Sequence, residues 1–294
     1  MARLFEETEI ILSGEKRRYY RLYDTTFVVG MPVMVLINGS GCQDFSIRLA
    51  SFFSHYSFPL NVYYLEKPYV LKDADGRVCS HAFYRMDYLE KRIADTLAFI
   101  DEEPVLSELP KHSVALLGFS EGGTVAVQVA SQSHKIGWLA TAGSGGGMSQ
   151  SEEFLLFAEK GIPPYSQPYS KDILLKEYAA IQRYPNSLEK VFFGHPYRYW
   201  SSYLFFNPLE IYAKLTIPIL SAMGELDDCV PVESGRVLQK YFLEHRNKHF
   251  TYIEYPGANH RLEINEQQYV HDFMQQFCAL VNKKCHAFKT YEGK

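Results

Sequence analysis

Short apolar runs recur along the chain, and helical patterns stand between several of them. The runs cover residues 32–38, 60–67, 112–119, 136–143, 217–224 and 249–256. Each run has the length of one strand, and its continuous apolar character indicates a strand that is covered on both faces. Because strands that alternate with helices form parallel sheets with crossover connections, we predict an α/β fold with a mostly parallel central sheet.

The connecting segments carry patterns of their own. Residues 9–24 predict an opening hairpin with "SGEK" as its turn. Residues 86–101 predict a helix because their apolar side chains recur at three- and four-residue steps, and residues 237–242 predict a short amphipathic helix. Asn265 is placed to cap a final helix, with Gln268 three residues later. The inner face of that helix would carry Val270, Phe273, Met274, Phe277 and Leu280.

Length and charge limit the classes of function. The 294 residues suffice for one α/β domain with an insertion and a sizeable core. A formal net charge of -4 gives no electrostatic basis for binding nucleic acid or an anionic membrane. No apolar run approaches the roughly 18 residues that a membrane-spanning helix needs.

The number and spacing of the cysteines indicate the redox conditions of the cellular compartment. Five are present at wide spacings and without a CxxC pair, namely Cys42, Cys79, Cys229, Cys278 and Cys285. We therefore expect neither a zinc site nor a redox dithiol. Single scattered cysteines suit a reducing compartment, where they act as small apolar residues, so we expect a cytoplasmic protein. The acidic N-terminal segment does not match a signal peptide, although one removed before residue 1 would leave no trace.

Residues 151–212 separate two predicted strands by far more than a crossover needs. The chain has 22 Tyr, 20 Phe and 2 Trp, and 15 of these 44 aromatics lie in this segment. A long aromatic insertion needs apolar surface to cover, so we expect a mostly helical lid over a cleft. The core would then comprise residues 1–150 and 213–294, with Tyr197, Trp200 and Phe205 as candidate substrate contacts. The alternative is a subdomain with its own small core that makes a homodimer contact.

Ser120 lies in the stretch "VALLGFSEGGTVAVQVA", after a buried run. The pattern G-x-S-x-G between a strand and a helix is that of a nucleophilic serine on a sharp turn. Gly118 and Gly122 would leave the room that such a turn requires, and the helix start would favour developing negative charge. Residues 124–130 alternate with period two and by themselves predict a strand. We give the motif precedence and predict a helix there, because small Ala and Val side chains can be buried on several sides.

A serine hydroxyl needs a base, and the base needs an acid that orients it. Of ten histidines, His260 follows the last predicted strand in a Pro-Gly loop, at the edge of the sheet where ligands bind in α/β folds. Asp227 follows the strand before it, with Asp228 and Glu225 as weaker candidates. For the oxyanion hole, the N–H of Glu121 is one expected donor. The second would come from Ser40 or Gly41 in "NGSGC", which ends an earlier strand.

These features together resemble the α/β-hydrolases. The resemblance rests on "GFSEGG", on G-x-x-D-x-x-V-P from Gly224 to Pro231, and on the late "PGANH", in the order Ser120, Asp227, His260. It covers roughly residues 8–282 and implies a sheet of about eight strands, a covalent acyl-enzyme on Ser120 and no cofactor or metal. Many relatives have His-Gly at the oxyanion loop, where this chain has Asn38-Gly39, so the resemblance does not indicate a subfamily.

The leading hypothesis is a serine hydrolase that cleaves an ester or thioester of a small acyl substrate with an apolar part. An aminopeptidase-like peptidase and an acyltransferase use the same machinery and are the alternatives within enzymes. A hydrolase fold without activity, serving as a ligand-binding or interaction protein, is the alternative from another class. The presence of candidates for all three catalytic positions favours an enzyme.

Overall fold

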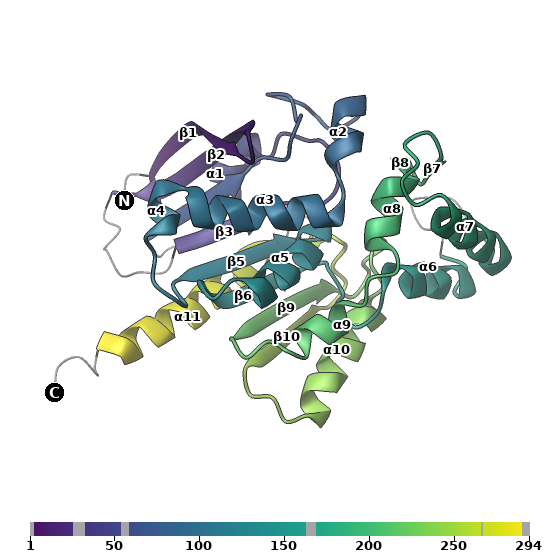
Figure 1. Ribbon diagram of the computed structural model, residues 1–294. Coiled ribbons are helices and arrows are strands. Elements are labelled where there is room, and N and C mark those ends of the chain that lie inside the picture. The colour runs from purple at the N-terminus through teal and green to yellow at the C-terminus, as the bar shows by residue number, and fades with distance from the viewer. Residues whose placement is uncertain (1–2, 26–32, 54–58, 163–168, 266, 290–294) are drawn as a thin grey trace.

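The computed structural model describes residues 3–25, 33–53, 59–162, 169–265 and 267–289. Its centre is an eight-stranded sheet in the order β1-β2-β4-β3-β5-β6-β9-β10 (Figure 1). The pairs β1–β2 and β2–β4 are antiparallel and the other five pairs are parallel, which confirms the mostly parallel sheet. The strands are β1 (Arg3–Leu12), β2 (Glu15–Asp24), β3 (Val33–Ile37), β4 (Asn61–Leu65), β5 (Val114–Phe119), β6 (Ile136–Ala142), β9 (Ile219–Gly224) and β10 (Phe250–Tyr255).

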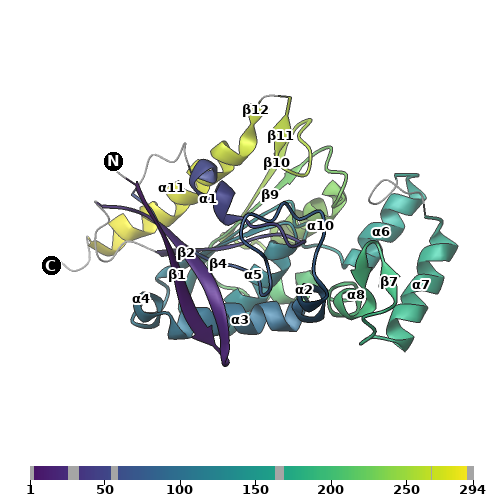
Figure 2. The same ribbon diagram turned by 90° about the horizontal axis from the view of Figure 1, so that it is seen from above.

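Helices cover both faces of this sheet (Figures 1 and 2). Alternate residues of one strand enter different cores: Val35 packs in the cluster formed with α3 and α5, whereas Leu36 packs in the cluster formed with α1 and α11. This division explains why the central strands read as continuous apolar runs. The helices outside the insertion are α1 (Ser46–Phe52), α2 (His81–Met86), α3 (Leu89–Glu102), α4 (Pro104–Ser107), α5 (Glu121–Gln132), α10 (Val232–Glu244) and α11 (Tyr269–Lys289).

Helix α5 occupies the segment whose alternation by itself predicts a strand. Val125, Ala126, Val127 and Val129 are all fully buried. The helix is therefore surrounded on several sides, so its hydrophobic pattern does not show the single apolar stripe of a surface helix.

The final helix begins later than predicted, and the predicted cap at Asn265 is wrong. Asn265 has φ 51° and lies in the connection between the two-residue strands β11 (Glu263–Ile264) and β12 (Gln267–Gln268). Asn tolerates this left-handed conformation, so it serves a turn here, and the helix starts at Tyr269. The expected inner face is largely confirmed, since Val270, Phe273, Met274 and Phe277 are buried and Leu280 is partly buried.

The insertion is mostly helical, as predicted, and projects beyond one end of the sheet (Figure 2). It begins shortly after the carboxyl end of β6, and its aromatic side chains join the hydrophobic cluster on the α3 and α5 side of the sheet. Its elements are α6 (Gln150–Glu159), α7 (Lys171–Arg183), β7 (Val191–Phe192), β8 (His195–Pro196), α8 (Tyr197–Tyr203) and α9 (Pro208–Tyr212).

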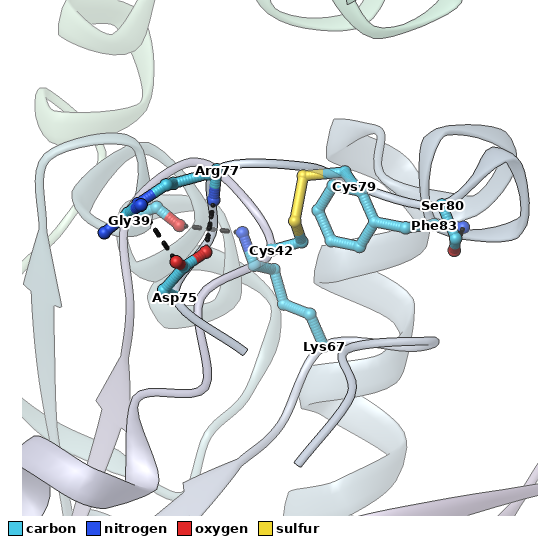
Figure 3. The surroundings of a disulfide bond; sticks show 8 residues. All are labelled: Gly39, Cys42, Lys67, Asp75, Arg77, Cys79, Ser80 and Phe83. Atoms are coloured by element: carbon cyan, nitrogen blue, oxygen red, sulfur yellow. Dashed lines mark hydrogen bonds and ion pairs between the residues drawn. A yellow bond between two sulfur atoms is a disulfide. The ribbon is translucent and has the colours of Figure 1, made fainter. Parts of the chain in front are cut away.

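Two of the five cysteines form a disulfide, so the expectation of isolated thiols is wrong. The sulfur atoms of Cys42 and Cys79 are 2.07 Å apart, and the two residues are separated by 37 positions in the sequence. They meet because the segments that follow β3 and β4 leave the same edge of the sheet from neighbouring parallel strands (Figure 3). Cys229 is not part of a disulfide. The argument from cysteines for a reducing, cytoplasmic compartment therefore loses its basis.

Within the described residues, no helix has the length and apolar character that crossing a membrane requires.

Candidate active site

Ser120 stands on a strained turn between β5 and α5. Its backbone has φ 52° and ψ -128°, a conformation that residues other than glycine rarely adopt. A Cβ atom added at Gly118 would lie 2.5 Å from the carbonyl oxygen of Gly122, and one added at Gly122 would collide with the carbonyl oxygen of Ile37. Both glycines are therefore needed for the tight packing of the turn, as the sequence motif suggests.

The structure brings Ser120, His260 and Asp227 together from three separate loops. His260 Nε2 lies 3.0 Å from Ser120 Oγ. On the other side of the ring, His260 Nδ1 lies 2.9 Å from Asp227 Oδ2 and 3.0 Å from Oδ1. The imidazole is thus held between a carboxylate and a hydroxyl, so that it can accept the hydroxyl proton.

Backbone N–H groups of nearby residues hold the side chain of Asp227 in place. Its side chain is buried, and Oδ1 accepts hydrogen bonds from the N–H groups of Cys229 (2.9 Å) and Val230 (2.8 Å). Asp228 is exposed, and Glu225 accepts a hydrogen bond from the N–H of Gly257. Of the three acidic candidates, only Asp227 contacts His260.

The candidate oxyanion donors lie on both sides of Ser120. Glu121 is the first residue of α5, so its N–H has no acceptor within the helix. Gly39 packs against Ser120: a Cβ atom added there would lie 3.1 Å from Ser120 Cβ. The Gly39 N–H is already bonded to Asn38 Oδ1, at 2.7 Å. Among the described residues, no acceptor engages the N–H of Ser40, which follows it in the chain.

A buried ionic cluster lies behind the loop that carries Asn38, Gly39 and Ser40, and no pattern in the sequence indicates it. Arg92 of α3 donates to the carbonyl oxygen of Asn38 (2.5 Å) and to the carboxylate of Glu121, which also accepts from the Tyr199 hydroxyl. Lys67, just beyond β4, donates to the carbonyl oxygen of Gly39 at 2.9 Å. Charged residues usually mark exposed positions, so no pattern in the sequence distinguishes these two cations from surface residues.

Burial and charge shift the pKa values in this region. Burial opposes ionisation of Glu121, but the adjacent Arg92 charge prevails and lowers the pKa of its carboxyl. Burial lowers the pKa of Lys67. Burial also raises the pKa of Glu153 in α6 to about 8, with the charge of Asp227 acting in the same direction. Glu153 is therefore mainly neutral at pH 7.

Two cavities meet at Ser120. The smaller one, of about 40 Å³, lies beneath the insertion and is lined by Ser40, Glu121, Glu153, Tyr199, Tyr203 and Phe206, among others. The larger one is an open groove of about 590 Å³. His260 lies on the wall of this groove, and its apolar surface comes from Phe45, Phe52, Phe119, Leu262 and Val270.

The aromatic residues proposed as substrate contacts do not line either cavity. Tyr197 and Trp200 are buried inside the insertion, where they donate hydrogen bonds to Glu177 and to the carbonyl oxygen of Phe192. Phe205 packs edge-on against Tyr178. Because successive helical side chains face different directions, the neighbouring residues Tyr199, Tyr203 and Phe206 reach the cavity instead.

Asp227, Cys229 and His260 form the one group of described residues whose donor atoms could hold a metal ion, within 4.8 Å of one another. Burial raises the pKa of the Cys229 thiol to about 12, whereas metal binding needs a thiolate. Asp227 and His260 are already hydrogen-bonded to each other. The group therefore fits acid–base chemistry better than metal binding.

Comparison with known proteins identifies the architecture. No protein-family model matches the chain, and no curated protein matches it. Solved structures do match. Est1E from Butyrivibrio proteoclasticus has a TM-score of 0.59 at 15% identity, over 93% of this chain and 99% of that chain. The serine hydrolase CarC, involved in carbazole degradation, has a TM-score of 0.57 at 16% identity, over 94% of this chain and 100% of that chain.

The chain has the α/β-hydrolase fold. A putative dienelactone hydrolase from Klebsiella pneumoniae subsp. pneumoniae MGH 78578 is also similar, with a TM-score of 0.57 at 15% identity over 96% of this chain and 99% of that chain. In α/β-hydrolases, as in other open α/β sheets, the carboxyl edge of the sheet carries the site. Here Ser120 directly follows β5, and His260 lies in the loop after β10, at that edge.

Proposed function

We propose that the protein is a serine hydrolase in which Ser120 is the nucleophile, His260 the general base and Asp227 the residue that orients His260. The observation that carries the proposal is the unbroken hydrogen-bonded line from the Asp227 carboxylate through both nitrogens of His260 to Ser120 Oγ. The strained backbone of Ser120 supports the proposal, because residues with strained backbone conformations are concentrated at functional sites.

The reaction follows from this geometry. His260 Nε2 takes the hydroxyl proton as Ser120 Oγ bonds to the acyl carbon, and Asp227 stabilises the imidazolium that forms. The N–H groups of Glu121 and of Ser40 stabilise the negative oxygen of the tetrahedral intermediate. The imidazolium then protonates the leaving group, which departs and leaves an acyl group on Ser120. His260 then deprotonates a water molecule, which attacks the acyl carbon of this acyl-enzyme. The bond from that carbon to Ser120 Oγ breaks, the imidazolium returns its proton to Oγ, and the acid is released.

The two cavities suggest how a substrate lies. Ser40 and Glu121 line the small cavity, so the acyl part belongs there beside the oxyanion donors. The leaving group must lie beside the imidazole that protonates it, and His260 lines the open groove. We therefore favour an ester or thioester of a short acyl group with a larger, partly apolar leaving group.

An aminopeptidase-like peptidase is the second candidate. Its support is the similarity to a putative dipeptidyl aminopeptidase IV from Bacteroides ovatus ATCC 8483, with a TM-score of 0.63 at 12% identity. That match spans 95% of this chain but only 36% of that one. An acyltransferase would share every step up to the acyl-enzyme and differ only in the final nucleophile.

We propose that residues 151–212 act as a lid between the two parts of the core, 1–150 and 213–294. The support is that α6 and α8 contribute Phe154, Tyr199 and Tyr203 to the wall of the small cavity, so this part of the insertion covers the site.

Removing the hydroxyl of Ser120 tests the proposed function. Ser120→Ala removes only one oxygen atom, so we expect the fold to persist, as judged by an unchanged thermal melt. Hydrolysis of p-nitrophenyl acetate and labelling by a fluorophosphonate probe should both disappear. Labelling that persists in this variant would place the nucleophile elsewhere.

A further inference from the structure

We propose that Lys67 and Arg92 are positioning residues that fix both donors of the oxyanion hole. The inference rests on the proposed hydrolase function and goes beyond it, since neither residue touches the substrate. Lys67 and Arg92 are both buried, and no pattern in the sequence distinguishes them from surface residues.

Lys67 sets the direction of the Ser40 N–H. Its ammonium group donates to the carbonyl oxygen of Gly39 at 2.9 Å (Figure 3). In a trans peptide plane, the C=O of one residue and the N–H of the next point in opposite directions. The Ser40 N–H therefore points away from Lys67. Because Gly39 packs against Ser120 and Ser40 lines the small cavity, this direction leaves the N–H available to the reacting oxygen.

Arg92 connects the same loop to the other donor. One of its nitrogens donates to the carbonyl oxygen of Asn38, one residue earlier in the loop, at 2.5 Å. Another nitrogen forms an ion pair with the carboxylate of Glu121, whose backbone N–H is the second oxyanion donor. One rigid, planar guanidinium thus ties the oxyanion loop to the first residue of α5.

The surroundings of Lys67 argue against a simple structural ion pair. Lys67 is 6% exposed, and the charge that most favours its ionised form is the buried carboxyl of Asp87, with Glu121 and Glu66 acting in the same direction. Both carboxyl oxygens of Asp87 lack a hydrogen-bond partner among the described residues, so Lys67 is not bonded to it. The ammonium group donates instead to the Gly39 carbonyl oxygen. Burying a cation is costly, and a role in holding that carbonyl accounts for its position.

Two further contacts hold Lys67 and the loop in place. The ammonium of Lys67 lies 5.3 Å from the centre of the Phe83 ring. Phe83 packs in one hydrophobic cluster with Cys42, whose disulfide bond anchors the loop two residues beyond Ser40 (Figure 3). The Ser40 peptide is therefore restrained from both sides.

The experiment compares two buried lysines. Lys67→Met removes the bond to the Gly39 carbonyl. The matched control is Lys135→Met, because Lys135 is also buried and donates to three backbone carbonyls, those of Ile100, Leu106 and Ser107, at the opposite edge of the sheet. Both proteins are assayed for kcat and KM with p-nitrophenyl acetate, for the rate of fluorophosphonate labelling, and for thermal stability.

We expect Lys67→Met to lower kcat by about 10- to 100-fold, less than the loss of an oxyanion donor, which costs about 10²- to 10³-fold. KM should change little, since the donors act mainly on the transition state. The labelling rate should fall in parallel, because negative charge also develops on the phosphoryl oxygen in the transition state of labelling. Lys135→Met should keep its kcat. Lys67→Arg, which retains a charged donor, should recover part of the rate.

Equal values of kcat in the two Met variants, or a loss confined to KM, would overturn the positioning role. If Lys67→Met does not fold, Lys67→Gln, which keeps a shorter donor, provides the same comparison. The outcome is separable from the proposed function: if Ser120→Ala is inactive while Lys67→Met matches the control, only this inference fails. If Ser120→Ala retains activity, the hydrolase proposal itself fails.

Discussion

Removing the Cys42–Cys79 disulfide should destabilise the protein by about 4 kcal/mol. The bond joins residues 37 positions apart. For a loop of about that length, the closure entropy lost by the unfolded chain is about 13 cal/mol/K, which is about 4 kcal/mol at 25 °C. With a urea dependence of about 3 kcal/mol/M, the unfolding midpoint would fall by about 1.3 M.

The assay is urea unfolding of the wild-type protein with and without dithiothreitol, alongside the double variant Cys42→Ser, Cys79→Ser. The double variant and the reduced wild type should unfold at the same lower midpoint, and reductant should not affect the variant. Cys229→Ser serves as the control, because Cys229 is a free cysteine and its loss should preserve the response to reductant. An unchanged midpoint in reduced protein, once a thiol titration has shown that the bond is open, would refute the reasoning.

Three further predictions concern the site. Asp227→Asn should reduce kcat by several orders of magnitude, because Asn disfavours the required tautomer of His260, whereas Asp228→Asn should have little effect; equal losses would contradict the assignment of Asp227. Glu153→Gln should alter how stability depends on pH. Because burial raises the pKa of Glu153 from 4.5 to about 8, the folded state binds the extra proton between these values. The wild type should therefore lose stability relative to the variant, by a few kcal/mol, as pH rises from about 4.5 to about 8; parallel curves in urea titrations would exclude this. Finally, kcat/KM for p-nitrophenyl esters should decline beyond short acyl chains because the acyl cavity measures about 40 Å³, and a preference for octanoate would reverse our orientation of the substrate.

The fold could be predicted from the sequence because the patterns that indicate its strands and turns are local. The continuous apolar runs predict buried parallel strands, and the glycines around Ser120 predict a tight turn, since each pattern reflects a steric need of its own segment. Context also resolved the ambiguous residues of α5, where a period-two pattern belongs to a helix buried on several sides.

The errors arose where residues distant in sequence determine the outcome. The partnership of Cys42 and Cys79 depends on the meeting of two loops, which their spacing does not reveal. Lys67 and Arg92 are ordinary charged residues in the sequence, and only the fold shows that they are buried and bonded to the backbone of Gly39 and Asn38. Asn265 fits a helix cap and a left-handed turn equally well, and the β11–β12 hairpin decides between them.

The hydrogen bond from Tyr199 to Glu121 has a consequence for the passage of molecules to and from the site. Tyr199 belongs to α8 of the insertion, and it bonds to the carboxylate that also holds Arg92. Lifting α8 away from the core would break this buried, charge-assisted hydrogen bond. The groove beside His260 is already open, so a molecule can enter and leave there while the hydrogen bonds among Tyr199, Glu121 and Arg92 stay intact.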